Sequence, residues 1–447
     1  EMKLETVKSF ILVVLIGISL ILSYTLWSYQ PNTGQTISGQ ILDQEMHVGG
    51  SKDVSKRSIV KPMDIIFHTA NGHYGFLHAI EQDYLYKEMQ EWVITDFQVV
   101  SEQSSISHDS TEKIELVFPD EISMELLNFL FTFGPDDLDE FPPWSMKRIL
   151  ISFIHDSKSL QLEFISESSN QRAVAMITNA KIYEKLWTII TELDETKLRK
   201  YLVINENTSP VYFPAGQIGL PTYSITPTEI KPARFVNILF TNPTVVRETR
   251  SQTLGEVYFT DNRQLSVYQN GMRMEYVSHL ATDDSNRILS KVDILDQAIH
   301  NINSHRGWTQ EYRLESIDLG EQRVTFQMYY DGYPVFNSYK LATIEQRWGV
   351  HQNSYQLIEY NRPLYRFENE FIWRKSTTLQ DGEEILTYLD KNPDISVENI
   401  QDIAIGYELK YQQDDEYIEL SPAWFKKEND SWQKITFSDQ ATPRGGN

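Results

Sequence analysis

The stretch Ser9–Tyr29 reads SFILVVLIGISLILSYTLWSY and contains no charged residue. Its 21 residues are enough for a helix to cross about 30 Å of hydrocarbon. Lys3 and Lys8 precede it, and the next Lys or Arg is Lys52. Because Lys and Arg are enriched on the cytoplasmic side of a membrane, this asymmetry predicts a cytoplasmic N-terminus and an extracytoplasmic bulk. The sequence therefore indicates a single-pass cell-membrane protein, with a cytoplasmic stub and transmembrane helix at 1–29.

A cleaved signal peptide is the alternative for this segment. Its apolar core would usually span about 7–15 residues and end at a small-residue cleavage site. Here the apolar run is longer, and no Ala-x-Ala-like site follows it. Trp27 and Tyr29 suit the membrane interface, and Pro31 prevents the helix from continuing. We therefore expect an uncleaved anchor.

Charge and cysteine content restrict which functions are possible for the expected extracytoplasmic part. The formal net charge is -23, and residues 1–29 carry equal numbers of acids and bases, so the acidic excess lies outside the membrane. An acidic exterior repels nucleic acid, anionic lipid and polyanionic wall polymers. The chain has no Cys, which excludes thiol catalysis, disulfides and thiolate metal sites. The absence of disulfides suits the outer face of a Gram-positive bacterium.

The exterior is expected to begin with a linker and an N-terminal α+β domain. Residues 30–57 are polar and lack hydrophobic periodicity, which is typical of a linker. Residues 58–228 alternate between helical and strand patterns. The expected helices are His78–Trp92, Ser123–Phe133 and Ala180–Glu192, and the expected strands are Lys113–Phe118, Arg148–Ile154, Leu160–Ile165, Tyr201–Asn205 and Val211–Phe213.

A central α+β domain is expected over 229–305. Asn270-Gly271 predicts a hairpin, because both central residues of such a turn need a positive φ. A helix over about Asp284–Asn303 follows, since its apolar residues recur on one face. The short aromatic runs that predict strands are FVNILF (235–240), EVYFT (256–260), QLSVYQ (264–269) and MRMEYVS (272–278).

The same plan of aromatic hairpins followed by a helix recurs in 306–440, where Glu383–Leu389 is the expected helix. We interpret this as a C-terminal α+β domain and as weak duplication of architecture, and we expect residues 441–447 to be disordered. The predicted fold class is therefore α+β: one N-terminal transmembrane helix and a multidomain exterior of antiparallel sheets with packed helices.

No catalytic motif of a hydrolase, metalloprotease or nucleotide-binding protein occurs in the chain. His68, His73 and His78 are close in sequence, but a spacing of five places successive side chains on opposite faces of a strand and about 140° apart on a helix. We therefore expect surface or hydrogen-bonded histidines and no metal site. The acidic cluster Asp136, Asp137, Asp139 and Glu140 lacks the spacing of a calcium-binding loop, so a solvated loop is the simpler interpretation.

Six motifs in order give the chain a family resemblance. It resembles the YycH family of two-component-system regulators of Bacillus and its relatives, over essentially its whole length, and the back half is also similar to YycI. These motifs are K-x-x-x-x-K-S-F-x-L (Lys3–Leu12), Y-x-L-W-x-Y-Q-P (Tyr24–Pro31), YFTDNRQLSVYQNG (Tyr258–Gly271), DGYPVF (Asp331–Phe336), IGYEL (Ile405–Leu409) and SPAWF (Ser421–Phe425).

The resemblance implies a non-enzymatic function in cell-wall homeostasis signalling. The protein would bind the essential sensor histidine kinase YycG (WalK), together with a YycI-like single-pass protein, and modulate its activity. The resemblance also implies PepSY-like units in the exterior, and it supplies no catalytic residues, cofactor or metal ligands. Self-association is left open, as is the sign of regulation.

Other functions stay open as alternatives. An extracytoplasmic wall-associated enzyme or carbohydrate-binding protein is the first, and a protease-inhibitor or chaperone-like role is the second. If the protein contacts a kinase within the bilayer, small residues on its helix would allow close approach. Ser19 and Ser23 form such a small-xxx-small pair, although both hydroxyls can also bond to their own helix.

Overall fold

The computed structural model describes Leu12 and residues 15–20, 35–36, 47–100, 111–135, 141–169, 171–251, 255–268, 270–279, 289–351, 354–368, 373–393 and 395–437. Leu12 and residues 15–20 are helical, but most of the predicted anchor Ser9–Tyr29 lies outside this set. Within these ranges, no helix has both the length and the apolar character needed to span a bilayer. The expected tail 441–447 and the acidic cluster 136–140 also lie outside the described residues.

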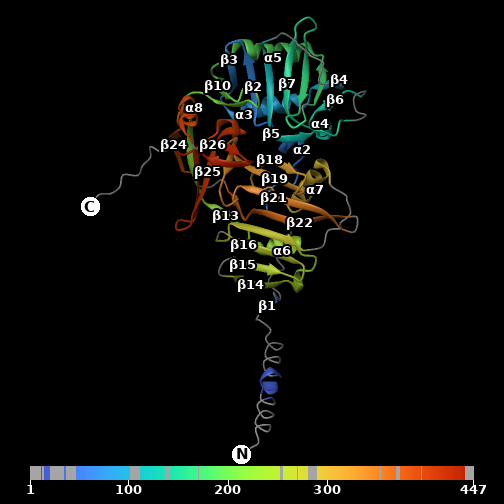
Figure 1. Cartoon of the computed structure of the whole chain (residues 1–447), viewed down its shortest axis with the longest axis vertical. Coiled ribbons are helices and arrows are strands. Elements are labelled where there is room, and N and C mark those ends of the chain that lie inside the picture. The colour runs from blue at the N-terminus through green and yellow to red at the C-terminus, as the bar shows by residue number, and fades with distance from the viewer. Residues whose placement is uncertain are drawn as a thin grey trace, which may run out of the picture.

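The first layer is a ten-stranded sheet with the order β11-β10-β3-β2-β5-β7-β8-β9-β4-β6, in which described neighbours pair antiparallel except β4 and β6. It occupies the upper part of Figure 1, and α3 (Ala79–Met89) and α5 (Ala180–Glu192) pack against it. The strands are β2 (Asp64–Thr69), β3 (Gly72–Phe76), β4 (Val93–Val100), β5 (Lys113–Ser123), β6 (Thr132–Phe133), β7 (Ser145–Ile154), β8 (Ser159–Ile165), β9 (Arg172–Ile177), β10 (Leu198–Ile204) and β11 (Val211–Pro214).

The second layer is a fifteen-stranded sheet in the middle and lower part of Figure 1. One part of this sheet contains β1 and β14 to β22, and the other contains β12 and β24 to β27, while β23 lies outside the sheet. The two parts are joined where β20 pairs in parallel with β25. Its strands are β1 (Gln35–Thr36), β12 (Gly219–Ile225), β14 (Arg247–Ser251), β15 (Gly255–Phe259), β16 (Arg263–Tyr268), β17 (Arg273–Ser278), β18 (Glu311–Asp318), β19 (Arg323–Tyr330), β20 (Tyr333–Phe336), β21 (Thr343–His351), β22 (Ser354–Pro363), β24 (Trp373–Thr378), β25 (Asp402–Gln412), β26 (Tyr417–Glu428) and β27 (Ser431–Lys434).

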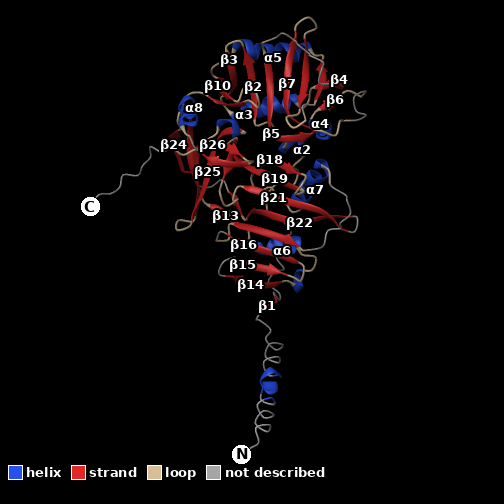
Figure 2. Cartoon of the chain, viewed as in Figure 1, coloured by secondary structure: helices blue, strands red, loops and turns tan. Residues whose placement is uncertain are grey.

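The remaining elements are short strands and helices around these layers. Strands β13 (Pro227–Glu229) and β23 (Tyr365–Phe367) form a separate pair. The other helices are α2 (Lys56–Ile59), η1 (Met124–Leu126), α4 (Leu127–Leu130), α6 (Pro232–Leu239), η2 (Pro243–Val245), α7 (Lys291–Ser304), α8 (Gly382–Lys391) and η3 (Val397–Asn399). Strands dominate the molecule, as Figure 2 shows, and the fold is a sheet-rich α+β fold.

Several predicted elements form for the expected reasons. Helix α5 covers the predicted range Ala180–Glu192, because the Asn179 side chain caps its first turn and its apolar face is buried. The hairpin at Asn270-Gly271 also forms, with φ of 54° and 89° at the two residues. Helix α7 begins at Lys291, later than predicted, after a capping box made by Ser290 and Asp293.

Two secondary-structure predictions were wrong. FVNILF (235–240) is expected to be a strand, but its first five residues belong to α6, which has Pro232 in its first turn and buries Phe235, Val236 and Leu239. A short, mainly apolar run fits either periodicity, and the proline decides in favour of the helix. The helix expected over Ser123–Phe133 is broken into η1, α4 and the short strand β6.

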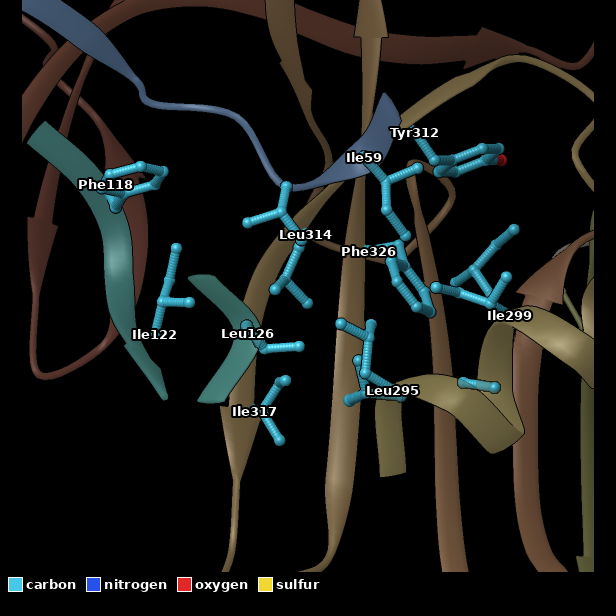
Figure 3. Close-up of a cluster of buried hydrophobic side chains, with 14 of the residues drawn as sticks. Ile59, Phe118, Ile122, Leu126, Leu295, Ile299, Tyr312, Leu314, Ile317 and Phe326 are labelled. Atoms are coloured by element: carbon cyan, nitrogen blue, oxygen red, sulfur yellow. The ribbon is translucent and has the colours of Figure 1, made fainter. Parts of the chain in front are cut away.

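The two layers share one hydrophobic core. Figure 3 shows its central part, where β5 and η1 of the first layer meet β18, β19 and α7 of the second. Side chains from both layers interdigitate there, so the two layers are held together by apolar packing as well as by the connecting chain. The labelled residues are Ile59, Phe118, Ile122, Leu126, Leu295, Ile299, Tyr312, Leu314, Ile317 and Phe326.

Candidate partner-binding surface

A groove of about 330 Å³ lies between α3 and α5 on the first layer. Helix α3 buries Leu85, Tyr86 and Met89 against the sheet. Tyr84 lines this groove and is 68% exposed, and Ile80, one turn earlier on α3, is 61% exposed. Large apolar side chains exposed beside a groove are typical of a surface that binds another protein.

The rim of this groove is acidic. Glu81, Glu88, Glu192 and Asp194 line it, against Lys185 and Lys197. The Lys185 ammonium donates to Glu88 and so neutralises one acid. One carboxylate oxygen of Glu81 is buried without a hydrogen-bond partner. The surplus of negative charge around an apolar floor favours a partner segment that carries Lys or Arg.

A second, larger groove of about 960 Å³ runs along the second layer, between β19 and β21 on one side and β25, β26 and β27 on the other. An aromatic stack lies in it: the Phe336 ring centroid is 4.4 Å from that of Phe425 and 4.9 Å from that of Trp432. Phe336 and Phe425 are buried, so the stack packs the sheet and does not present its rings to a sugar. Tyr339 is the exposed aromatic residue of this groove.

The three histidines that are close in sequence, His68, His73 and His78, do not form one cluster. His68 on β2 and His73 on β3 are paired opposite each other in a hairpin, and their Nδ1 atoms lie 2.8 Å apart. The expectation that the spacing of five separates them was therefore wrong for this pair, because the chain reverses between them. His78 instead precedes α3 as its N-cap residue. In the described ranges, no group of three or more His, Asp or Glu is placed to hold a metal ion.

The histidine pair belongs to a buried charge network. The His68 Nε2 atom donates to Glu115 at 2.8 Å, and Arg148 donates to the other oxygen of Glu115 at 2.6 Å. Burial works against ionisation of Glu115, but the His68 hydrogen bond and the Arg148 charge prevail and lower its pKa to about 2. Burial, reinforced by the neighbouring His68, lowers the pKa of His73. Glu115 is thus held in its ionised form between His68 and Arg148 inside the first layer.

Of the predicted transmembrane contact residues, Ser19 is described and Ser23 lies outside the described residues. Ser19 is exposed on a helical segment. The α3–α5 groove was not predicted. The sequence does contain a signal for this surface. Ile80 and Tyr84 are large apolar residues one helical turn apart, and they are out of phase with the residues that α3 buries.

Comparison with known proteins identifies relatives along the whole chain. The family model described as YycH protein, N-terminal domain, matches residues 5–195, and the model for the YycH protein, C-terminal domain, matches residues 208–442. The chain is 22% identical over 452 residues to the two-component system WalR/WalK regulatory protein YycH of Bacillus subtilis (strain 168), covering 97% of each protein. The crystal structure of YycH from Bacillus subtilis has the same fold, with a TM-score of 0.69 and 19% identity over 87% of this chain and 98% of that chain.

Proposed function

The chain belongs to the YycH family, and from this premise we propose that it is a non-enzymatic, membrane-anchored protein that binds a sensor histidine kinase and modulates its activity. The observation that carries the proposal is the match over 97% of both chains to a protein named as a WalR/WalK regulatory protein. A match of that extent covers both layers of the exterior and their junction, so the relative's regulatory role is the best guide to this chain.

The proposed topology follows from the sequence. A helix at 1–29 would hold the N-terminus in the cytoplasm and the two layers outside the cell membrane. In this position the exterior would meet the extracytoplasmic part of the kinase, and a YycI-like single-pass protein would complete the assembly. No cofactor is needed for regulation by contact.

Two contacts with the kinase are part of the proposal. Within the bilayer, Ser19 and Ser23 would let a kinase helix approach closely. Outside, the α3–α5 groove would receive a basic segment of the kinase, since its floor is apolar and its rim is acidic. Exposed Ile80 and Tyr84 would supply the apolar part of that contact.

The proposal is tested by the output of the pathway. A strain that lacks the gene should show changed expression of a WalR-dependent reporter, and the full chain supplied in trans should restore it. Unchanged reporter output in the deletion strain, under conditions where the kinase is active, would exclude a regulatory role. Purified full chain should also show no turnover of peptidoglycan, which separates this function from the wall-enzyme alternative.

A further inference from the structure

A cavity of about 100 Å³ lies at the junction of the two layers. The first layer contributes Asp64 of β2 and Arg199 and Tyr201 of β10, and the second layer contributes Arg313 of β18 and Tyr333 of β20. A space of this volume holds several water molecules or one compact ion. Junctions between structural units are common places for ligand sites.

Arg199 brings an unmatched charge to this cavity. It shares a face of β10 with Tyr201, because side chains two apart on a strand point the same way. Its Nε atom is buried and has no hydrogen-bond partner. Among the described residues, no carboxylate forms an ion pair with Arg199. A guanidinium cannot lose its proton in a protein, so the charge is permanent.

The other acidic and basic groups at the cavity are ion-paired, hydrogen-bonded or mainly neutral. Arg313 is paired with Glu311 at 2.8 Å and with Asp83 at 3.0 Å. Burial, together with the nearby Asp402, raises the pKa of Asp64 to about 8, so this carboxyl is mainly neutral at pH 7. Asp331, at the turn beside the cavity, accepts a hydrogen bond from Tyr223 at 2.7 Å. Among the described charged residues that line the cavity, Arg199 is therefore the one cation without a carboxylate partner.

We propose that the junction cavity binds a small oxyanion, of the phosphate, sulfate or short carboxylate class, with Arg199 as its main ligand and the Tyr333 hydroxyl as a second donor. A planar guanidinium matches such an oxyanion in both charge and hydrogen-bond geometry. The Tyr333 hydroxyl has no hydrogen-bond partner among the described residues. Because the walls come from both layers, the bound anion would strengthen their junction. This inference does not depend on the proposed kinase contact.

The test measures anion binding to the full chain purified in mild detergent. Inorganic phosphate, sulfate and acetate are titrated by calorimetry and by thermal unfolding, at constant ionic strength set with sodium chloride. At least one of them should bind saturably and raise the Tm above the chloride value. Arg199→Gln should weaken that binding by about tenfold or more, because a hydrogen bond to a charged group is lost. Tyr333→Phe should weaken it less.

Lys200→Gln is the matched control. It removes the same charge from the next residue on β10, whose exposed side chain lies on the opposite face of the strand. This variant should bind the anion like the wild type. If Arg199→Gln does not fold, Arg199→Lys replaces it as the test variant. It keeps the positive charge but loses the planar guanidinium, so it should bind the anion more weakly than the wild type does. Absence of saturable binding by all three anions would overturn the proposal. An equal Tm increase in the wild type and the Arg199 variant would also overturn it, because a general salt effect does not depend on the side chain at position 199.

Discussion

The Arg313 guanidinium on β18 lies 3.0 Å from the Asp83 carboxylate on α3, and this ion pair links the second layer to a helix of the first. Asp83 also accepts from Lys61 at 2.8 Å, and the Arg313 guanidinium stacks 4.1 Å from the ring centroid of Tyr329. Arg313 is almost fully buried. A charge in such a place depends on its partners, because water no longer solvates it.

Asp83→Asn should therefore destabilise the protein. The variant keeps the shape of the side chain but removes the charge that faces Arg313 and Lys61. We expect a loss of about 1–3 kcal/mol in the free energy of unfolding, measured by chemical denaturation. Glu184→Gln is the control, because it breaks a solvent-exposed pair with Lys158, and it should leave the stability almost unchanged. Equal effects of the two substitutions would contradict the importance of the junction.

The shared core predicts that both layers unfold together. Leu314 is buried in the core between them, so Leu314→Ala should cost about 2–5 kcal/mol through lost contacts and a cavity. Leu319→Ala, at an exposed position just after the same strand, should be nearly neutral. Calorimetry should show one unfolding transition for the two layers, shifted as a whole in the Leu314 variant. Two separate transitions, with only one of them shifted, would show that the layers are independent.

The buried carboxyls of Asp64 and Asp402 predict that the free energy of unfolding depends on pH. Both line a small cavity with Lys147 and Arg148. Burial raises the pKa of Asp64 from 3.8 to about 8, and burial also raises that of Asp402 to about 6, although Lys147 and Lys427 oppose the shift. The folded chain thus keeps protons that the unfolded chain releases above its ordinary carboxyl pKa. Stability from these groups is complete below about pH 4 and is lost as the pH rises through the folded values.

Asp64→Asn removes the carboxyl with the larger pKa shift, and with it the larger contribution to the pH dependence of stability. The free energy of unfolding of the wild type should fall relative to that of the variant between pH 5 and 8, by at most about 1.4 kcal/mol per pH unit. Denaturant unfolding of both proteins at pH 5, 6, 7 and 8 measures this difference. A constant difference across that range would show that Asp64 is ionised in the folded chain.

The bilayer contact has its own test. Ser19→Leu combined with Ser23→Leu keeps the segment apolar enough to insert but fills the space that a partner helix needs. We expect weaker cross-linking to the kinase and altered reporter output, with expression and topology unchanged. Ser9→Leu, at the cytoplasmic end of the same segment, is the control and should behave as the wild type. Wild-type cross-linking by the double variant would place the contact elsewhere.

The features that depend on local sequence were predicted well. Helix α5 and the Asn270-Gly271 hairpin depend on a cap and on turn residues that are visible in the sequence. FVNILF was misassigned because a short run of mainly apolar residues fits both a strand and a helix. The hairpin that joins His68 and His73 was missed, although the turn-forming Asn71 and Gly72 lie between them.

The surfaces and cavities could not be predicted in the same way. The junction cavity brings Arg199 beside Tyr333, and the acidic groove brings Glu81 beside Glu192. These residues are far apart in the chain, and their contacts follow from how helices and sheets pack. Hydrophobic periodicity gives the elements and their buried faces, but it does not give the partner of each face.

Site-specific photo-cross-linking in living cells can detect the proposed contact between the chain and the kinase. A photoreactive amino acid is placed at position 84, where Tyr84 is exposed beside the α3–α5 groove, and separately at position 319, where Leu319 is exposed on the second layer. After irradiation the full chain is purified from membranes and cross-linked proteins are identified. We expect the WalK-type kinase as a cross-linked product from position 84 and little or none from position 319. Absence of the kinase from the products of position 84, with the variant still regulating the reporter, would contradict the proposed contact.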